Sequence, residues 1–360
     1  MKELVIFIPS IEFGGVEKNL SYISNFLAKK YKQIILISAA KPKNKIFNKN
    51  IKILAPKSNF FKNKSRLIKS FICTFLLYKN FYNKNTLILS FQSNFFSIII
   101  SKIIKSKIII RLNTSPEKYA SDILKKIFFR KLYNLSDEII VNSNEFKKNL
   151  FKYFKLKSNV ILNPIDTKKS FKKKINYFRN FKGLKIISIG RLTHQKDQIT
   201  LLKALNELKK KYRLDFKLYM IGKGYNYNLL SNFVIKNKLN KNIKLAGYKK
   251  NAFQYLKSAD LLILSSRYEG LPNTLIEAQV AGIPIISSDC PSGPKEILMN
   301  GKLGELFKVG DYKDLYKKIY NYNRNKNILK KKSITAKKYL YRFDYKTNLN
   351  KYLKIINKYN

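Results

Sequence analysis

The strongest constraint on the fold is an alternation of short, continuously apolar runs with longer amphipathic segments. Such runs predict strands buried on both faces of a parallel sheet, because helices cover each face. They fall into two series: "LVIFI", "QIILIS", "TLILS", "KIIIR" and "EIIVNS", then "LKIISIG", "FKLYMIG", "IKLAG", "LLILSS" and "IPIISS". Two series in 360 residues predict two doubly wound, Rossmann-like α/β domains with parallel sheets.

The boundary between these domains is expected at "NPID". Asn163-Pro164 is a turn signal, and the Lys-rich tract after it has little apolar periodicity, as in a linker. We therefore expect a first domain at 1–166 and a second at 167–337. Residues 338–360 form the end of a helical, polar tail.

The chain is strongly basic, with 74 Lys and Arg residues, 21 Asp and Glu residues and a formal net charge of +53. One explanation is A/T-rich coding, since Lys, Asn, Ile, Phe and Tyr are all abundant. The other is attraction to a polyanion. Arg, which nucleic-acid readers use for bidentate contacts, is scarce, and no zinc-finger or RNA-binding motif is found. We therefore expect no nucleic acid, and an anionic membrane surface is the favoured polyanion.

Three features bear on location. The apolar run before Pro9 is too short for the core of a signal peptide and is typical of a buried first strand. Lysines interrupt the apolar stretch at 95–110, which predicts a helix followed by a strand rather than a spanning helix. Cys73 and Cys290 make no disulfide framework, which fits the cytoplasm.

The segment 60–82 has apolar residues at helical spacing and basic residues around them. Its apolar face contains Phe60, Phe61, Leu67, Ile68, Phe71, Ile72, Phe75 and Leu76. Two interpretations stay open: a core helix packed on the first sheet, and an interfacial helix on an anionic bilayer.

Basic residues and glycines follow the first two strands of the second domain. Gly190 allows a sharp turn, and Arg191 and Lys196 lie on the loop that enters the next helix. A helix N-terminus with two nearby cations is a candidate phosphate site, and a solvated loop is the alternative. Gly222 and Gly224 would let a ligand approach the backbone, or would simply form a turn.

Two carboxylates flank the turn in "RYEGLPNTLIEA". Asn273 suits a helix start after Pro272, so we expect Glu269 at the loop tip and Glu277 about one turn inside the helix. Carboxylates accept hydrogen bonds from sugar hydroxyls and helix amides hold phosphate, so this stretch suits a nucleotide sugar. A capping Glu and a surface Glu are the alternative. The local enrichment in acids comprises Glu269, Glu277, Asp289, Glu296 and Glu305.

With these marks in order, the sequence resembles the retaining glycosyltransferase family 4 (glycosyl transferases group 1), which has the two-domain GT-B fold. The marks are E-x7-E ending at Glu277, G-R-x4-K ending at Lys196, "NPID", and Gly14-Gly15 ahead of a helix. "SSDCPSGPKEIL" also resembles a subgroup that transfers galactose-type or N-acetylhexosamine units. The resemblance covers most of the chain. It implies two domains facing across a cleft, with the last helix returning onto the first domain.

The resemblance also implies roles for single residues. Arg191 and Lys196 would neutralise the donor diphosphate, Glu269 would bind the donor sugar and Glu277 would bind the ribose; of these, Glu269, Arg191 and Lys196 are the catalytic candidates. The remaining donor-binding candidates are Gly14, Gly15, Gly190, Gly222, Tyr248, Gly270, Leu271, Asn273, Thr274 and Leu275. Cationic side chains and helix amides would stabilise the leaving diphosphate, so we expect no metal and no cofactor. The donor is expected to be a UDP-linked sugar, and its anomeric configuration would be retained.

The first domain departs from the family pattern. Many relatives place a His there near the reacting carbon, whereas the one His of this chain, His194, lies on the phosphate-side loop. The loops "SFQSN" (90–94) and "RLNTSP" (111–116) are the candidates to face the reaction. Arg111 and Asn113 are the acceptor-side candidates.

We therefore expect a cytoplasmic, retaining hexosyl- or N-acetylhexosaminyltransferase that is peripheral on the inner face of the cell membrane. Its partners would be a nucleotide sugar, a lipid-linked or cell-surface glycan acceptor and an anionic membrane surface. The alternatives are a sugar-nucleotide epimerase of the same fold and a charge-driven nucleic-acid-binding protein. Release of nucleoside diphosphate only when an acceptor is present would separate the transferase from both.

Overall fold

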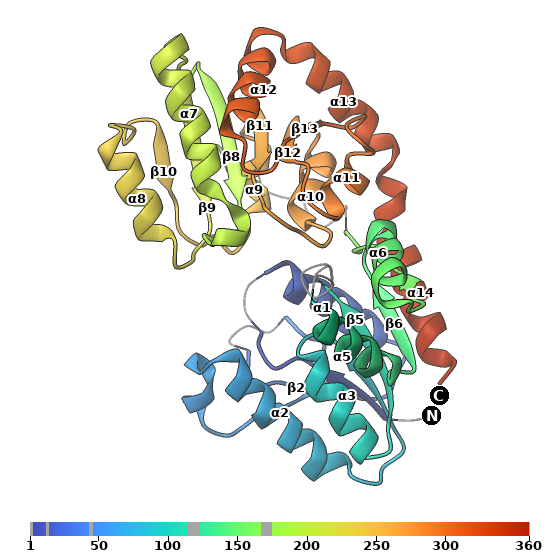
Figure 1. The fold of residues 1–360 in the computed structure, drawn as a ribbon. Coiled ribbons are helices and arrows are strands. Elements are labelled where there is room, and N and C mark those ends of the chain that lie inside the picture. Colours follow the sequence, from blue (N-terminus) through green and yellow to red (C-terminus); the bar gives the residue numbers. More distant parts are fainter. Residues whose placement is uncertain (1–2, 12–13, 43–45, 114–121, 167–174, 360) are drawn as a thin grey trace. The chain divides into compact units, whose positions relative to one another are not determined.

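The computed structural model describes residues 3–11, 14–42, 46–113, 122–166 and 175–359, which form two compact units (Figure 1). The first unit joins Met1–Pro164 to Tyr345–Asn360, and the second is Ile165–Asp344. Part of the expected linker, 167–174, lies outside the described residues. Each unit is a parallel sheet with helices on both faces, so the α/β prediction is confirmed.

The sheet of the first unit has seven strands in the order β3-β2-β1-β4-β5-β6-β7, and every pair is parallel. The strands are β1 (Glu3–Phe7), β2 (Ile34–Ile37), β3 (Ile51–Leu54), β4 (Thr86–Ser90), β5 (Lys107–Leu112), β6 (Glu138–Val141) and β7 (Asn159–Val160). The central β1 pairs with β2 and β4, with Leu4 opposite both Ile34 and Leu87. Strand order reverses next to β1, which is the doubly wound arrangement expected for such a sheet.

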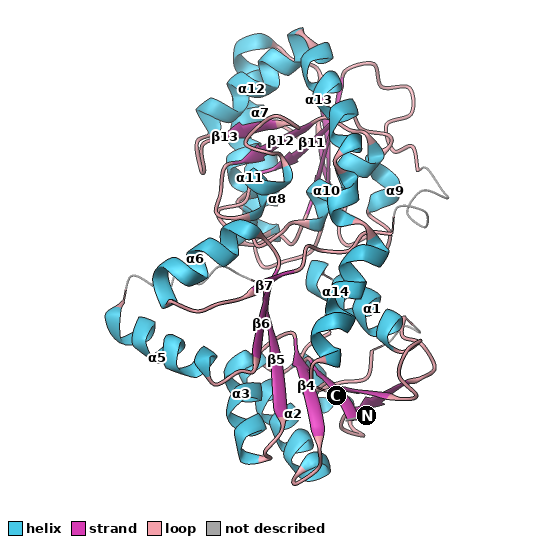
Figure 2. Cartoon of the chain, turned by 90° about the vertical axis from the view of Figure 1, so that its right-hand side faces the viewer, coloured by secondary structure: helices cyan, strands magenta, loops and turns pink. Residues whose placement is uncertain are grey.

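Helices cover both faces of this first sheet. They are α1 (Gly15–Leu27), α2 (Arg66–Phe81), α3 (Asn94–Ile103), α5 (Ile123–Asn134), α6 (Asn144–Phe154) and α14 (Tyr345–Asn357), with the 3-10 turn η1 (Asn59–Asn63). Val5 and Phe7 join the core formed with α2, α3, α5 and α6, whereas Leu4 and Ile6 join the core formed with α1 and α14. The C-terminal α14 thus lies beside α1 in the first unit (Figure 2).

The sheet of the second unit has six strands in the order β10-β9-β8-β11-β12-β13, again all parallel. The strands are β8 (Leu184–Ile189), β9 (Phe216–Ile221), β10 (Ile243–Leu245), β11 (Leu261–Leu264), β12 (Ile285–Ser288) and β13 (Glu305–Phe307). The helices are α7 (Gln198–Tyr212), α8 (Tyr227–Lys236), α9 (Phe253–Leu256), α10 (Asn273–Ala281), α11 (Gly293–Ile297), α12 (Tyr312–Arg324) and α13 (Lys326–Lys338), with 3-10 turns η2 (His194–Lys196) and η3 (Leu340–Phe343). Strand order reverses next to β8, so the ends of β8 and β11 lie side by side.

The segment 60–82 forms η1 and α2, and α2 packs on the first sheet through a stripe different from the one expected. Its buried stripe includes Cys73, Leu77 and Phe81, so the core-helix interpretation holds for this side of the helix. Leu67, Ile68, Phe71 and Phe75, which the spacing grouped into the apolar face, are exposed, as is Phe60 of η1. The core-helix interpretation therefore does not apply to this face, because α2 carries apolar residues on two sides and packs on the sheet through the other one. The small Ser70 and Cys73 are on the side that meets the sheet.

The stretch 95–110 forms α3 followed by β5, as predicted. Among the helices of the described residues, none combines the length and the hydrophobicity that crossing a bilayer requires.

Candidate active site

The loops after β8 and β9 pack directly against each other through their backbones. The amide of Gly190 donates to Ile221 O (3.0 Å) and that of Leu192 donates to Lys223 O (2.9 Å). A Cβ on Gly222 would lie 1.8 Å from Gly190 O, and one on Gly224 would lie 2.1 Å from Leu192 O. Packing between loops therefore explains both glycines, without a ligand near either backbone.

The loop after β8 also meets the loop after β11, and the two carry opposite charges. Lys196 Nζ and Glu269 Oε1 form an ion pair, and Ser266 Oγ donates to the same carboxylate oxygen at 2.5 Å. Glu269 is only 5% exposed, and the Lys196 side chain is largely buried. Glu269 lies on the loop after β11, as expected, and its amide donates to Pro291 O (2.8 Å).

Further hydrogen bonds fasten these two loops together. Ser265 Oγ donates to Lys196 O (2.9 Å), and the amide of Arg267 donates to Gln195 O (2.8 Å). Gln195 Nε2 donates to Tyr268 O at 3.0 Å. Gln195, Ser265 and Ser266 were not predicted from the sequence. Their only sequence signal is that each is a polar residue at a strand end or in the loop that follows it.

The second predicted cation, Arg191, has a different environment from Lys196. Arg191 is exposed, and its guanidinium donates a long hydrogen bond to Gln195 Oε1 (3.5 Å). His194 is also exposed, and its backbone amide donates to the Tyr225 hydroxyl (3.2 Å). The loop therefore has one cation held inward and one that extends into solvent.

Helix α10 begins at Asn273, as predicted, directly after the Glu269 loop. Its N-cap is Pro272, whose side chain has no acceptor for the amides of the first turn. Glu277 is buried within the helix, so the two glutamates lie on the loop and inside the helix as expected. The start of α11 closes on this loop, since a Cβ on Gly293 would lie 2.0 Å from Gly270 O.

The other donor-binding candidates of the second unit lie at the start of α10 and after β10. Gly270, Leu271, Thr274 and Leu275 belong to the turn and first turn of α10. Tyr248 follows β10 at the outer strand and is partly exposed, and burial of its ring raises the pKa of its hydroxyl.

Gly14, Gly15, Arg111 and Asn113, the remaining candidates, belong to the first unit. Gly14 is the N-cap of α1 and Gly15 its first residue, so these glycines start a helix, as expected. A Cβ on Gly14 would lie 2.7 Å from Glu17 Oε2.

Arg111, an acceptor-side candidate, is instead 1% exposed and fully engaged with the protein. Its guanidinium donates to the Tyr352 hydroxyl (2.8 Å), to Asn163 Oδ1 (2.7 Å) and to Asn113 Oδ1. Asn113 in turn donates to Phe91 O (2.6 Å). This network joins β5 to α14, which argues against direct contact between Arg111 and an acceptor. Residues 114–116 of the neighbouring candidate loop lie outside the described residues.

Two other acids of the enriched region, Asp289 and Glu305, pair with lysines. Asp289 pairs with Lys295 (3.2 Å), and Glu305 pairs with Lys318 (3.5 Å) and with Lys332. Within the described ranges, no group of three or more His, Cys, Asp or Glu side chains is placed to hold a metal ion.

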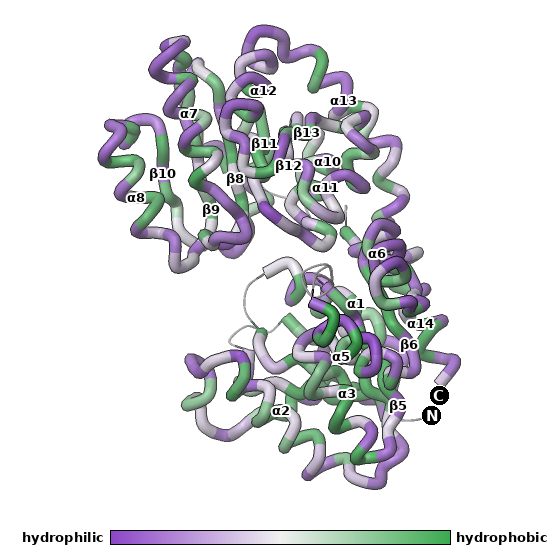
Figure 3. Tube along the Cα trace, in the orientation of Figure 1, coloured by the Kyte–Doolittle hydropathy of each residue, from purple (hydrophilic) through white to green (hydrophobic). Residues whose placement is uncertain are grey.

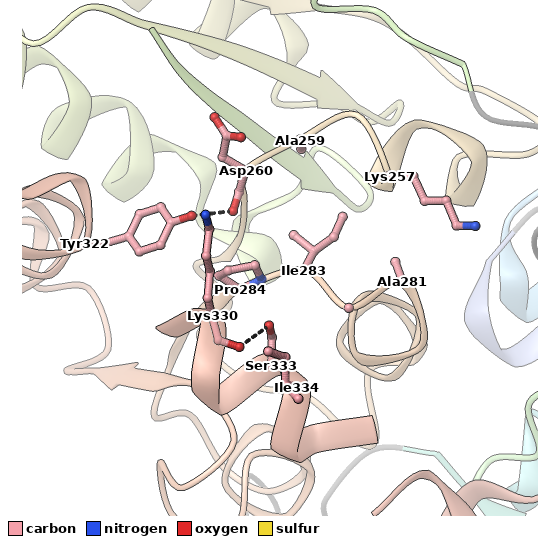
Figure 4. A pocket seen from close by; sticks show the side chains of 11 residues that line it. Lys257, Ala259, Asp260, Ala281, Ile283, Pro284, Tyr322, Lys330, Ser333 and Ile334 are labelled. Atoms are coloured by element: carbon pink, nitrogen blue, oxygen red, sulfur yellow. Dashed lines mark hydrogen bonds between the residues drawn. The ribbon is translucent and has the colours of Figure 1, made fainter. Parts of the chain in front are cut away.

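A separate hollow of about 490 Å³ lies elsewhere in the second unit (Figure 4). Asp260 and Pro284, which line it, directly precede β11 and β12, so it lies at the amino ends of the strands. Tyr322 donates to Asp260 O across it (2.7 Å). Ligands of parallel sheets bind at the carboxyl ends, so the strand ends of β8 and β11 are the candidate site.

Comparison with known proteins gives one family. Residues 169–339 match the family described as "Glycosyl transferases group 1". The uncharacterized glycosyltransferase MJ1059 of Methanocaldococcus jannaschii is 36% identical over 218 residues, 56% of this chain and 53% of that protein, so this alignment spans about half of the relative. The amylovoran biosynthesis glycosyltransferase AmsD of Erwinia amylovora is 29% identical over 83% of this chain and 84% of its own.

Solved structures show the same fold. The structure of Anabaena Alr3699/HepE in complex with UDP and glucose superposes with a TM-score of 0.81, 16% identity, and coverage of 99% of this chain and 100% of that one. The two parallel-sheet units thus have the GT-B fold, which these solved glycosyltransferases share. Residues 169–339, which lie within the second unit, match the glycosyl transferases group 1, the family that the sequence resembles.

Proposed function

We propose that this enzyme transfers a hexose or N-acetylhexosamine from a UDP-linked sugar to a lipid-linked or cell-surface glycan, with retention of configuration, at the cytoplasmic face of the membrane. Relatives support the acceptor class. An N-acetylgalactosaminyltransferase of Campylobacter jejuni named for a diphospho-undecaprenol acceptor is 23% identical over 88% of each chain. Proteins of the same fold solved with UDP and glucose, or with UDP and GlcNAc, support the donor class.

The observation that carries the proposal is the Lys196–Glu269 ion pair at the adjoining ends of β8 and β11. A donor diphosphate placed here offers Lys196 a stronger anionic partner than one carboxylate. Lys196 would then turn to the phosphate, and Glu269, still held by Ser266, would accept hydrogen bonds from the sugar hydroxyls. Without a donor, Lys196 and Glu269 neutralise each other. With the donor bound, each has a new partner, so neither charge is buried without one.

Groups around the pair would serve the rest of the donor. Arg191 extends from the same loop and would contact the diphosphate, and the first amides of α10 would bind its oxygens. Glu277 would accept from the ribose hydroxyls, and Tyr248 would lie near the base. As the sugar–phosphate bond breaks, these cations and amides stabilise the charge on the leaving diphosphate without a metal. The acceptor then attacks the oxocarbenium-like sugar from the face that the leaving group vacates.

A donor panel tests this function. The purified protein is incubated with UDP-glucose, UDP-galactose, UDP-GlcNAc and UDP-GalNAc, with and without undecaprenyl-diphosphate-linked oligosaccharides and with EDTA. We expect UDP release from one donor only when acceptor is present, an α-linked product by NMR, and unchanged activity in EDTA. Release or epimerisation without acceptor would contradict the proposal and favour a sugar-nucleotide epimerase.

A further inference from the structure

Three neighbouring helices of the first unit expose apolar side chains along their outer sides. The exposed residues are Leu67, Phe71 and Phe75 of α2, Phe95, Ile99 and Ile103 of α3, and Ile123, Leu124, Ile127 and Phe128 of α5. We call this set the three-helix surface. On α2 and α3 the members are four residues apart, so each set forms one stripe along its helix. Figure 3 shows hydrophobic segments on all three helices.

The three stripes are continuous from helix to helix. The rings of Phe71 on α2 and Phe96 on α3 are 4.9 Å apart between centroids, and those of Phe95 on α3 and Phe128 on α5 are 5.9 Å apart. Aromatic contacts at these distances bridge both helix–helix boundaries. The exposed residues therefore form one patch rather than scattered single side chains.

The fold does not need this patch for its core. Each helix packs on the sheet through other residues: Leu77 for α2, Ile98 for α3 and Leu132 for α5 are buried in the same cluster. Contiguous apolar patches of this kind on a folded protein mark an interaction surface.

The charge around the three-helix surface has one sign. The sequence contains no Asp or Glu between Glu17 and Glu117, an interval that includes all of α2 and α3. In α5 the residues from Ile123 to Asn134 contain four basic residues and no acid, and Asp122, which caps the helix, pairs with Lys125 (2.8 Å). Lys64, which follows η1, lies over the ring of Phe60 at 4.2 Å.

We propose that the three-helix surface docks this enzyme on an anionic lipid bilayer, with its apolar residues in the acyl–headgroup boundary and its Lys and Arg side chains on lipid phosphates. Apolar residues flanked by basic ones, with one acid that is paired with a lysine, suit that occupant: the apolar side chains match the acyl chains and the cations match the lipid phosphates. The proposal deepens the lipid-linked acceptor proposed above, and it replaces the single interfacial helix expected from the sequence by three helices acting together.

Vesicle sedimentation of the full chain tests the docking surface. One exposed residue is changed on each helix: Phe75→Ser (61% exposed), Ile99→Ser (40%) and Leu124→Ser (79%). The matched control is Ile235→Ser on α8 of the second unit, 59% exposed. Each surface variant should lower partitioning onto phosphatidylglycerol vesicles by at least ~5-fold and the triple variant should abolish it, whereas the control should bind as wild type. Binding of the wild type should fall at high salt and be weak on phosphatidylcholine alone.

The outcomes separate this proposal from the proposed function. UDP titration of the triple variant should match wild type, because none of the changed residues is a donor-binding candidate. If neither the wild type nor any variant binds UDP, but the wild type binds vesicles and the surface variants do not, only the donor site is rejected. Vesicle binding that survives the triple change, or equal binding to neutral vesicles, would overturn the docking surface. A dimer in sedimentation velocity that the triple change dissociates, with no vesicle binding, would show that a second copy covers the surface instead.

Discussion

Lys196 and Glu269 form a largely buried ion pair although 73 residues separate them in the chain. The pair exists because β8 and β11 are neighbours in the sheet and their following loops meet. Ser266 donates to the same carboxylate, so Glu269 keeps one partner when Lys196 moves. We interpret the pair as the ligand-free state of a donor site. In the bound state, the ammonium of Lys196 would bind phosphate and the carboxylate of Glu269 would bind the sugar hydroxyls.

Glu269→Gln keeps the shape of the side chain and removes its charge. We expect turnover at saturating donor to fall at least ~10-fold, about 1.4 kcal/mol of transition-state stabilisation, because the sugar hydroxyls lose a charged acceptor. Initial rates on the best donor of the panel measure this, with urea unfolding as a check on folding. An unchanged rate in a stably folded variant would exclude Glu269 from the reaction.

Arg191→Ala tests the exposed cation of the loop. Because Arg191 is exposed, its loss should leave the free energy of unfolding near wild type. UDP affinity should fall by roughly 10- to 100-fold, since a charge-assisted contact contributes about 1.5–3 kcal/mol. Lys236→Ala, an exposed cation in the last turn of α8, is the control and should bind UDP normally. Equal affinities in both variants would mean that Arg191 is merely solvated.

Gly222→Ala tests the packing of the loops after β8 and β9. The new Cβ would lie 1.8 Å from Gly190 O, so the loops must separate, and we expect a loss of about 2–3 kcal/mol in the free energy of unfolding. Gly190→Ala is the matched comparison for stability, because its Cβ would meet the Lys196 side chain at an ordinary 3.5 Å. Urea unfolding of both variants decides the point; similar losses in the two would contradict the packing explanation.

The two buried thiols predict an alkaline loss of stability. Burial raises the pKa of Cys73 to about 12, and burial together with the charge of Glu269 raises that of Cys290 to about 12, from an ordinary 9.0. Above pH 9.0 the unfolded thiols ionise while the folded ones stay protonated, so stability present below pH 9.0 is lost as the pH rises towards 12.

Each thiol contributes up to about 1.4 kcal/mol per pH unit over that range. Urea unfolding in reducing buffer at several pH values measures the slope, and the double variant Cys73→Ala/Cys290→Ala should show a shallower decline. The same slope in the double variant would assign the pH dependence to other groups.

Continuous apolar runs allowed the central strands to be predicted, because burial on both faces makes the interiors of β1, β4 and β11 apolar. The strands that sequence reasoning missed, β3, β7 and β13, all lie at sheet edges. Edge strands are short and partly exposed, as Lys52 of β3 illustrates, so their runs are not continuously apolar.

The candidate site was also predicted only in part from the sequence. Local signals located the loop of Arg191 and Lys196 and the start of α10. The ion pair of Lys196 with Glu269 depends on strand order, which no local pattern contains. The role of Arg111 was also beyond local reasoning, because its partner Tyr352 lies 241 residues away on α14.

The most direct test of the donor site is calorimetric titration of UDP into the wild type, Lys196→Met and Glu269→Gln. If the diphosphate takes Lys196 from Glu269, Lys196→Met should weaken UDP binding by roughly 10-fold or more, because a charge-assisted contact is lost. Glu269→Gln should bind UDP as well as wild type or better, because the ammonium no longer has to leave a carboxylate. Opposite responses from two partners of one ion pair would support the exchange. Equal weakening in both variants, or wild-type affinity in Lys196→Met, would contradict it.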